Sequence, residues 1–442
     1  MTGRALCVDF GSTFTKAALV DLGTGELLGS ASHPTTLATD VLDGLAAIRE
    51  QLDVRDVDDV RACSSAGGGL RLGVVGYERV VTAEAGHRVG LSAGARVVHV
   101  ASGAMDRAAV EALLHERPDV VLLAGGTDGG NAEILLHNAD RLARSRLRVP
   151  VVVAGNADAR DEVAAVLVAR GKTAIPTANV LPRIGMLDPQ PAREAIRDVF
   201  IRHVIGGKHL SRSPAFAAMV RAATPDAVLT GVELLADGAG EVAGSGDVLV
   251  VDVGGATTDV YSVVTPEGED ADLHREVVEV MWRSRTVEGD LGVRWNAPGV
   301  LAAAVAEHLV GPDEAALLAP SAATRAADPS YLPTTADDRA EDARLAELAL
   351  TVALRRHART SNKSLRRVRL VVGSGGVLRH AEPAVSARVL APAGSDLAGG
   401  WALPDHAEMV VDRRYVLAAA GLLAEDHAGA AACLLRSELG IA

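Results

Sequence analysis

The sequence predicts an α/β protein in which two related lobes share one architecture and a further α/β domain is inserted. Three observations carry this prediction. Two short motifs, Asp9–Lys16 and Asp252–Asp259, align without gaps, and each follows an apolar strand. Between them, short apolar strands alternate with helical stretches, which is typical of parallel βαβ units. The chain also has 442 residues, a length that suits about three domains.

The composition is that of an acidic globular protein. Apolar residues make up 48% of the chain and charged residues 23%, close to the average for folded domains. The formal net charge of −13 repels nucleic acid and anionic lipid, and an aromatic content of 2% leaves little for a base-stacking surface. We therefore expect neither a nucleic-acid partner nor a membrane partner.

The cysteines and the N-terminal segment bear on the compartment. Cys7, Cys63 and Cys433 are far apart and form no CxxC motif, which argues against zinc and iron–sulfur sites. Residues 1–20 lack the regions of a signal peptide, and no apolar run is long enough to span a bilayer. We therefore expect a cytoplasmic protein without disulfides.

The first part of lobe I is expected over residues 1–65. Ranges 5–10, 14–20 and 26–32 are strand-like and are joined by turns that contain glycine, which predicts an antiparallel start to a sheet. Apolar residues at helical spacing then predict a helix over 40–52, and a strand is predicted over 60–63.

The inserted α/β domain is expected over residues 66–230. Predicted strands at 97–100, 120–123, 151–153 and 173–175 alternate with helices at 105–116 and 161–170. The glycine-rich segment Leu123–Asn131 either forms an anion-binding nest or is only a tight connection between a strand and a helix.

Lobe II is expected over residues 231–442. It begins with predicted strands at 248–253 and 258–264, followed by one near 276–281. A helical region over 300–318 should be broken by prolines, namely Pro312, Pro320, Pro329 and Pro333. A helix at 344–359, a strand at 368–372 and a last helix at 414–423 complete the lobe.

Each of the two aligned motifs is expected to form a turn that binds phosphate. Glycine lets the backbone bend and lets a phosphate approach, while successive backbone N–H groups form an anion-binding hollow. Hydroxyl groups and a lysine add donors and positive charge. The residues predicted to contact phosphate are Gly11, Ser12, Thr13 and Lys16 in the first motif, and Gly254, Gly255, Ala256 and Thr257 in the second.

The aspartates that end the two strands have a different predicted role. Asp9 and Asp252 cannot bind phosphate directly, because like charges repel. They can hold the water molecules of a hydrated Mg²⁺ that neutralises the phosphates, since Mg²⁺ keeps several waters. We therefore expect Asp9 and Asp252 to be both the metal-binding pair and the catalytic residues.

A third motif, Val371–His380, consists of an apolar strand, a glycine cluster and the start of a helix. Backbone N–H groups at such a place can face a ligand, and glycine leaves room for a flat ring. Gly373, Gly375 and Gly376 are therefore candidate contacts for a nucleoside, with an ordinary strand-to-helix turn as the alternative.

Together the three motifs resemble those of the actin, Hsp70 and sugar-kinase ATPase superfamily. The resemblance implies duplicated ribonuclease H-like lobes with Mg²⁺ and ATP bound in the cleft between them. It implies that Asp9 and its motif form the first phosphate loop, that Asp252 and its motif form the second, and that Gly373–Gly376 contacts the adenosine.

A longer set of segments is similar to one family within that superfamily. The chain contains DFGSTFTKAALVD, VVLLAGGTDGGN, VLVVDVGGATTDVYSV, RTVEGDLGVR and YVLAAAGLL. These resemble the MutL accessory proteins of adenosylcobalamin-dependent glutamate mutase (methylaspartate mutase), which are unrelated to the mismatch-repair protein of that name. The resemblance implies an ATP-dependent reactivating or assembly factor. It places Glu288, in RTVEGDLGVR, at the nucleotide cleft or a lobe hinge, with a surface ion-paired turn as the alternative.

Two functions stay open from the sequence. The first is an ATPase whose lobe movement is transmitted to the subunits of a cobalamin-dependent glutamate mutase or a related carbon-skeleton mutase or aminomutase. The chain lacks the D-x-H-x-x-G pattern that ligates cobalamin, so it would contact the mutase and not the cofactor. The second is a small-molecule kinase of the same fold, which would need a base near its acceptor hydroxyl.

Overall fold

The computed structural model describes residues 3–54, 57, 59–66, 70–77, 86, 95–184, 186, 188–205, 210–265, 283–361 and 364–441. The chain divides into two compact units. The first combines residues 1–66, 210–265 and 282–442, and the second contains residues 67–209. Each unit is described by itself.

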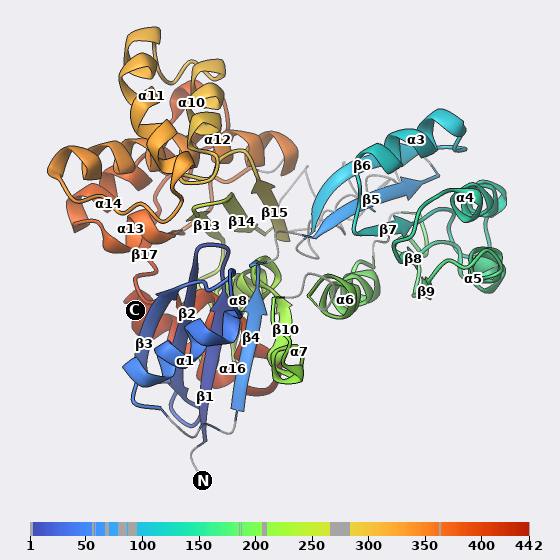
Figure 1. Cartoon of the computed structure of the whole chain (residues 1–442), viewed down its shortest axis with the longest axis horizontal. Coiled ribbons are helices and arrows are strands. Elements are labelled where there is room, and N and C mark those ends of the chain that lie inside the picture. Colours follow the sequence, from blue (N-terminus) through green and yellow to red (C-terminus); the bar gives the residue numbers. More distant parts are fainter. Residues whose placement is uncertain are drawn as a thin grey trace. The chain divides into compact units, whose positions relative to one another are not determined.

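Lobe I, in the first unit, is built on a five-stranded sheet of order β10-β4-β1-β2-β3. Its strands β1, β2 and β3 pair antiparallel, whereas β4 and β10 run parallel to β1. Figure 1 shows that the blue N-terminal strands and the green β10 lie in one sheet, although they are far apart in the chain. The strands are β1 (Arg4–Phe10), β2 (Phe14–Asp21), β3 (Leu27–Pro34), β4 (Asp59–Ser64) and β10 (Val220–Ala223).

Lobe II repeats this arrangement with a sheet of order β15-β14-β13-β16-β17. Again three strands pair antiparallel and two continue the sheet in parallel. The strands are β13 (Val248–Val253), β14 (Thr258–Val263), β15 (Arg283–Glu288), β16 (Leu370–Ser374) and β17 (Glu408–Val411). The shared strand order confirms the predicted duplication of ribonuclease H-like lobes.

Two helices, α8 (Thr224–Asp237) and α16 (Val416–Leu439), share one hydrophobic core with both sheets. A Cβ on Gly421 of α16 would lie 1.8 Å from the carbonyl oxygen of Ala227, and one on Gly231 of α8 would lie 2.1 Å from that of Leu417. Glycine at both positions therefore lets the two helix backbones touch.

The other face of the lobe II sheet is covered by helices. Alternate residues of β13 point to opposite sides of the sheet and therefore pack into two different cores. Leu249 and Val251 pack against this helical layer, whereas Val248 and Val250 face the core of α8 and α16. The layer consists of α10 (Ala297–Ala306), α11 (Pro312–Ala327), α12 (Ala336–Ser361), α13 (Gly376–His380), α14 (Pro383–Leu390) and α15 (Pro392–Ser395).

The predicted helix break at Pro320 is wrong. Pro312 begins α11, where proline suits the first turn, but Pro320 lies inside the helix. Burial of Leu318 and Ala322 on either side outweighs the hydrogen bond that the ring removes. The helix predicted at 344–359 is also longer, since α12 spans Ala336–Ser361. The strand expected near 276–281 lies outside the described residues.

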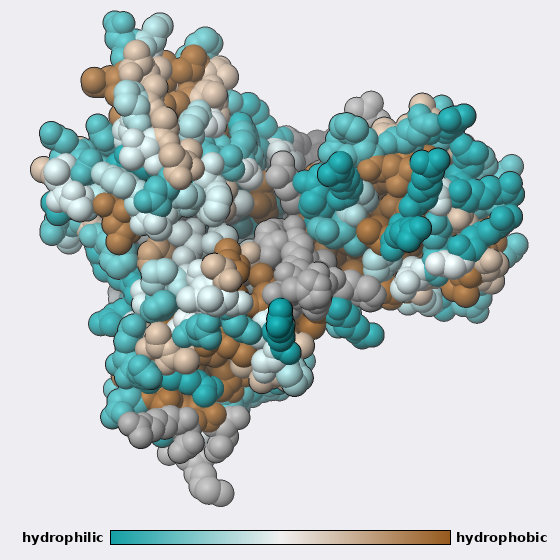
Figure 2. All heavy atoms as spheres, in the orientation of Figure 1, coloured by the Kyte–Doolittle hydropathy of each residue, from teal (hydrophilic) through white to brown (hydrophobic). Residues whose placement is uncertain are grey.

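The second unit contains a parallel five-stranded sheet of order β6-β5-β7-β8-β9. Its core holds apolar residues of β5, β7 and β8 and of the helices α3 (Arg107–His115), α4 (Glu133–Arg144) and α5 (Arg160–Val168). Hydrophilic residues predominate on the visible surface over these helices (Figure 2). The strands are β5 (Arg71–Gly76), β6 (Arg96–Ser102), β7 (Val120–Leu123), β8 (Val151–Val153) and β9 (Ala174–Pro176).

The end of the insert differs from the predicted boundary at residue 230. Residues 210–230 belong to the first unit, because β10 pairs with β4 and α8 packs against α16. Four strand residues rich in alanine carry too little pattern for the sequence to reveal this pairing. Among the helices of the described ranges, none has the length and apolar character needed to cross a membrane.

The other elements of the described residues belong partly to the first unit and partly to the second. They are α1 (Val41–Gln51), α6 (Gln190–Val199), a π-helical segment (Phe200–Ile205), α7 (Pro214–Met219), β11 (Gly238–Ala239), β12 (Val242–Ala243) and 3-10 turns at Ala157–Ala159 and Leu397–Gly399.

Candidate functional site

The two aligned motifs form the same turn at the same place in their lobes. Gly11 N donates to the carbonyl oxygen of Phe14 at 3.1 Å, and Gly254 N donates to that of Thr257 at 2.9 Å. A Cβ on either glycine would lie within 2.8 Å of that carbonyl oxygen. The loops β1–β2 and β13–β14 are therefore equivalent in conformation as well as in sequence.

Asp9 is held by donors from three other elements. The Thr224 hydroxyl, at the start of α8, donates to Asp9 Oδ1 at 2.5 Å, and Cys63 Sγ lies 3.7 Å from the same oxygen. Burial and the neighbouring Asp9 raise the pKa of the Cys63 thiol, so that it stays protonated and can donate. Lys16 Nζ, across the β1–β2 ladder, lies 3.3 Å from Oδ2. Protein donors thus engage both carboxylate oxygens.

Asp252 occupies the matching place in lobe II but has different neighbours. Its cross-strand partner is Asp259, where lobe I has a lysine. Burial raises the pKa of Asp252 to about 7, with Asp259, Asp9 and Asp412 adding to the rise and Lys16 opposing it. In the part of the chain that the structure describes, no hydrogen-bond donor reaches this carboxylate. A cation beside Asp252 would therefore be stabilised.

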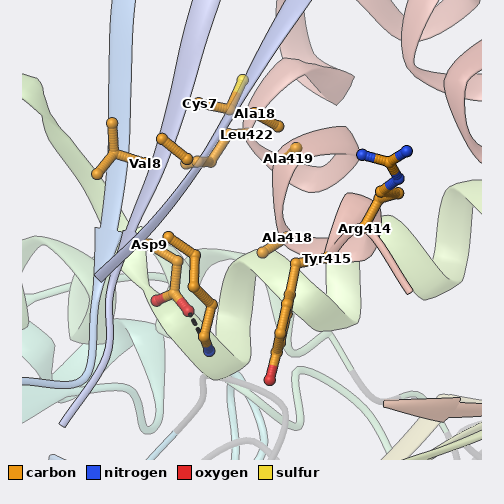
Figure 3. Close-up of a pocket in the computed structure, with 11 residues that line it drawn as sticks. Cys7, Val8, Asp9, Ala18, Arg414, Tyr415, Ala418, Ala419 and Leu422 are labelled. Carbon is orange, nitrogen blue, oxygen red and sulfur yellow. Dashed lines mark hydrogen bonds and ion pairs between the residues drawn. The ribbon is translucent and has the colours of Figure 1, made fainter. Parts of the chain in front are cut away.

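Lys16 connects the first loop to the start of α16. Its Nζ lies 3.8 Å from the ring centroid of Tyr415, and Figure 3 shows Asp9 and Tyr415 among the residues that line one small pocket. Although burial opposes the charged form, Tyr415, Asp9 and Asp252 together raise the pKa of Lys16. These neighbours favour the charged form of the lysine beside Asp9, near the end of β1.

The two loops approach one another at Thr13 and Gly255. A Cβ on Gly255 would lie 3.0 Å from Thr13 Oγ1. That hydroxyl oxygen is buried and finds no hydrogen-bond partner among the described residues. A buried hydroxyl without a partner carries a desolvation cost that a bound polar ligand would remove.

The second loop is supported by the segment that follows β15. The carbonyl oxygen of Gly254 accepts from Val293 N, and that of Gly255 accepts from Arg294 N and Trp295 N. The Arg294 side chain binds Asp342 through both carboxylate oxygens, at 3.1 and 2.7 Å. A second buried arginine, Arg325, also binds Asp342. A buried Arg–Asp–Arg triad therefore anchors the loop support to α11 and α12.

The glycines of the third motif lie in different environments. Gly375 has a φ of +105°, and its Cβ would lie 2.1 Å from the carbonyl oxygen of Val253, directly before the second loop. Gly376 has open space where a Cβ would be, so a ligand can approach its backbone. Gly373 instead packs against Leu390. The motif thus abuts the second loop through Gly375 and leaves Gly376 accessible.

Glu288 is engaged by the protein itself. Its carboxylate lies 2.7 Å from Arg356 of α12, which also binds Asp290 at 2.8 Å. Burial raises the pKa of Glu288, with Arg356 opposing the rise. The structure thus places this predicted site residue in an ion pair at the end of β15.

The glycine-rich segment of the second unit is tied down internally. Asn179 Nδ2 donates to the Gly126 carbonyl and to the Asp128 carboxylate, and Asn156 Nδ2 donates to the Gly130 carbonyl. These bonds favour the tight strand-to-helix connection over an anion-binding nest. They hold the Asp128 carboxylate in the loop, and a carboxylate there would repel a bound anion.

Two residues of the candidate site were missed by sequence reasoning. Thr224 has no motif around it, and only the pairing of β10 with β4 brings it to Asp9. Tyr415 lies within YVLAAAGLL, but nothing in that segment signals a contact with Lys16. The scarcity of lysine and of aromatic residues is the one signal that could have drawn attention to the pair.

Comparisons with known proteins match nearly the whole chain. Residues 5–439 match the family described as MutL protein. Protein MutL of Clostridium tetanomorphum is 36% identical over 444 residues, which covers 95% of this chain and 96% of that protein.

Solved structures are similar only at a low level. Nucleotide-free acetone carboxylase aligns with 96% of this chain and 70% of its own at 15% identity and a TM-score of 0.39. Xylulose kinase from Bifidobacterium adolescentis aligns with 99% of this chain and 94% of its own at 14% identity and a TM-score of 0.33. Similarity of this degree bears on neither activity nor substrate.

Proposed function

Since the chain belongs to the MutL protein family, we propose that it binds Mg²⁺–ATP between its lobes and serves as an accessory protein of an adenosylcobalamin-dependent mutase. The observation that carries the nucleotide part is the pair of equivalent turns, each closed by a glycine N–H, that meet at Thr13 and Gly255. Two such turns can hold a triphosphate from both sides with backbone N–H groups and hydroxyls.

The residues present fit the nucleotide. Thr13 Oγ1 is a buried hydroxyl oxygen without a hydrogen-bond partner among the described residues, and Lys16 Nζ lies 3.8 Å from where a Cβ on Gly11 would be, so its positive charge is close to the first loop. The open space at Gly376 can admit the adenosine. The net charge of −13 is no obstacle, because these local donors act at short range, within the Debye length.

The residues present also fit Mg²⁺. Asp9 and Asp252 end equivalent strands and influence one another electrostatically. One or two carboxylates together with waters and phosphate oxygens are the usual ligands of this ion. Bound there, Mg²⁺ would offset the negative charge of the phosphates.

In this proposal Asp9, Asp252 and Lys16 have different roles at the phosphates. Asp9 is held in place by Thr224 and Lys16 beside the first loop. Asp252 has no donor among the described residues and is the carboxylate suited to orient an attacking water. Lys16 stabilises negative charge in the first loop.

The accessory role rests on the family and on the joint between the lobes. Gly231 and Gly421 let the backbones of α8 and α16 touch, and in this proposal the lobes shift at this helix contact when nucleotide enters or leaves. A mutase subunit that binds one lobe arrangement better than the other would respond to that shift.

Two measurements test this proposal. Isothermal titration calorimetry with ATP should show binding that requires Mg²⁺ and is lost in Asp252→Asn; absence of binding in wild-type protein would refute the nucleotide part. For the accessory part, glutamate mutase holding an inactivated cobalamin should regain turnover when this protein and ATP are added, but not with a non-hydrolysable ATP analogue. ADP release that instead responds to a sugar or carboxylate acceptor would establish a kinase.

A further inference from the structure

Tyr415 adopts a backbone conformation that its place in the fold does not explain. Four non-glycine residues of the described ranges have positive φ. Asp53, Arg117 and His308 each follow the last residue of a helix and its C-cap, where the left-handed conformation is common. Tyr415 instead precedes a helix, with φ +58° and ψ +41° at the N-cap of α16.

The strained turn at Tyr415 is held from lobe II. Asp412 accepts hydrogen bonds from Val416 N at 2.9 Å and Leu417 N at 3.1 Å, and so caps α16. Asp412 N in turn donates to the carbonyl oxygen of Gly373 at 2.8 Å. Gly373 lies in β16, the strand of the third motif, and Asp412 directly follows the neighbouring strand β17. The left-handed conformation is strained for a residue with a Cβ, so a fixed turn is needed to maintain it.

The result of this turn is that the ring faces cations from two motifs. Lys16 Nζ, from the first loop in lobe I, lies 3.8 Å from the ring centroid. Arg379 Cζ, from α13 in lobe II, lies 5.0 Å from it. The face of an aromatic ring attracts cations, and Tyr415 therefore links the phosphate lysine of one lobe to the glycine motif of the other.

We propose that Tyr415, in lobe II, is a positioning residue. Its ring holds the ammonium group of Lys16, in lobe I, at the place where this group meets the phosphates of a bound nucleotide. This inference rests on the proposed function and adds a residue to it. Lys16 has a long flexible side chain whose ordering costs entropy, and the ring together with Asp9 removes that freedom before the ligand arrives. The affinity for phosphates thereby comes to depend on the arrangement of both lobes.

A double-mutant cycle on Tyr415 and Lys16 tests the proposal, with adenosine, ADP and ATP binding measured by calorimetry in the presence of Mg²⁺. Tyr415→Leu removes the ring and keeps an apolar side chain, whereas Tyr415→Phe keeps the ring. We expect Tyr415→Leu to weaken ATP and ADP binding by roughly 3- to 10-fold and to leave adenosine binding unchanged. Tyr415→Phe should retain most of the affinity. In a Lys16→Met background, Tyr415→Leu should have no further effect on ATP binding.

The outcomes separate a positioning role from a structural one. Equal losses for adenosine and ATP, or losses that add to those of Lys16→Met, would overturn the inference and leave the proposed function standing. Wild-type protein that binds none of the three ligands would overturn both. Thermal unfolding of each variant identifies a folding defect, and a loss of ATP affinity in folded Tyr415→Phe, which keeps the ring, would also overturn the inference.

Discussion

The Thr224 hydroxyl lies 2.5 Å from a carboxylate oxygen of Asp9, although 215 residues separate the two along the chain. Thr224 follows the fifth strand of lobe I, and Asp412 follows the fifth strand of lobe II. Whereas Thr224 donates a hydrogen bond to Asp9, the Asp412 carboxylate raises the pKa of Asp252. Equivalent positions of the duplicated lobes thus carry opposite chemistry. Asp9 is satisfied by donors, whereas Asp252 lies near three other carboxylates, with Lys16 as the opposing cation.

Loss of the Thr224 hydroxyl should weaken the first loop. We expect Thr224→Val to leave Asp9 Oδ1 without its shortest bond and to lower the free energy of unfolding by about 1–3 kcal/mol. Urea denaturation measures this change. Thr224→Ser keeps the hydroxyl and is the matched control. Equal stability of the Val and Ser variants would show that the bond contributes nothing.

Stability without ligand should fall as the pH rises. Burial raises the pKa of Asp252 to about 7, above that of an unfolded aspartate near 4, so the folded protein binds this proton more tightly. The stabilisation is complete below about pH 4 and is lost as the pH rises through about 7. Asp252→Asn should reduce this dependence and be more stable than wild type at pH 8, by at most about 4 kcal/mol.

Urea denaturation of ligand-free protein at pH 5 and pH 8 checks the Asp252 prediction. Glu241→Gln, on the exposed turn between β11 and β12, is the control and should keep the wild-type pH dependence. An Asp252→Asn protein with an unchanged pH dependence would contradict the assignment. Part of the pH dependence should remain in the variant, because burial also raises the pKa values of Asp259 and Asp412.

Two neighbouring glycines should respond oppositely to alanine. Gly375→Ala places a Cβ 2.1 Å from the Val253 carbonyl oxygen at a φ of +105°, so we expect a loss of several kcal/mol or failure to fold. Gly376→Ala meets open space and should preserve the melting temperature while reducing adenosine affinity. Calorimetric titration with adenosine measures the second effect. Undiminished affinity would place the nucleoside elsewhere.

Breaking the buried triad should be costly. Asp342→Leu leaves Arg294 and Arg325 buried without their shared anion, and we expect about 3–5 kcal/mol of destabilisation. At the exposed Arg107–Glu111 pair of α3, Glu111→Gln should change stability by less than about 1 kcal/mol. Chemical denaturation of both variants provides the comparison. Similar small effects would mean that the triad is dispensable.

Much of the fold could be predicted because its signals are local. The apolar runs that became β1, β2, β13 and β14 are followed by glycine turns, and the structure has strands and turns at these positions. The predictions that differed depend on distant partners. Pro320 stays within α11 because Leu318 and Ala322 are buried beside it, and β10 exists only as a partner of β4.

The sequence by itself determined the two phosphate-loop candidates. Glycine at positions 11 and 254 and aspartate at positions 9 and 252 specify turn geometry and charge within a few residues, so a repeated motif suffices to reveal them. Only the tertiary structure decided how the two aspartates differ. Thr224 and Cys63 reach Asp9, and Asp412 approaches Asp252, through strands and helices that meet in space. Burial and nearby charges set the pKa of a carboxylate, and both result from tertiary packing.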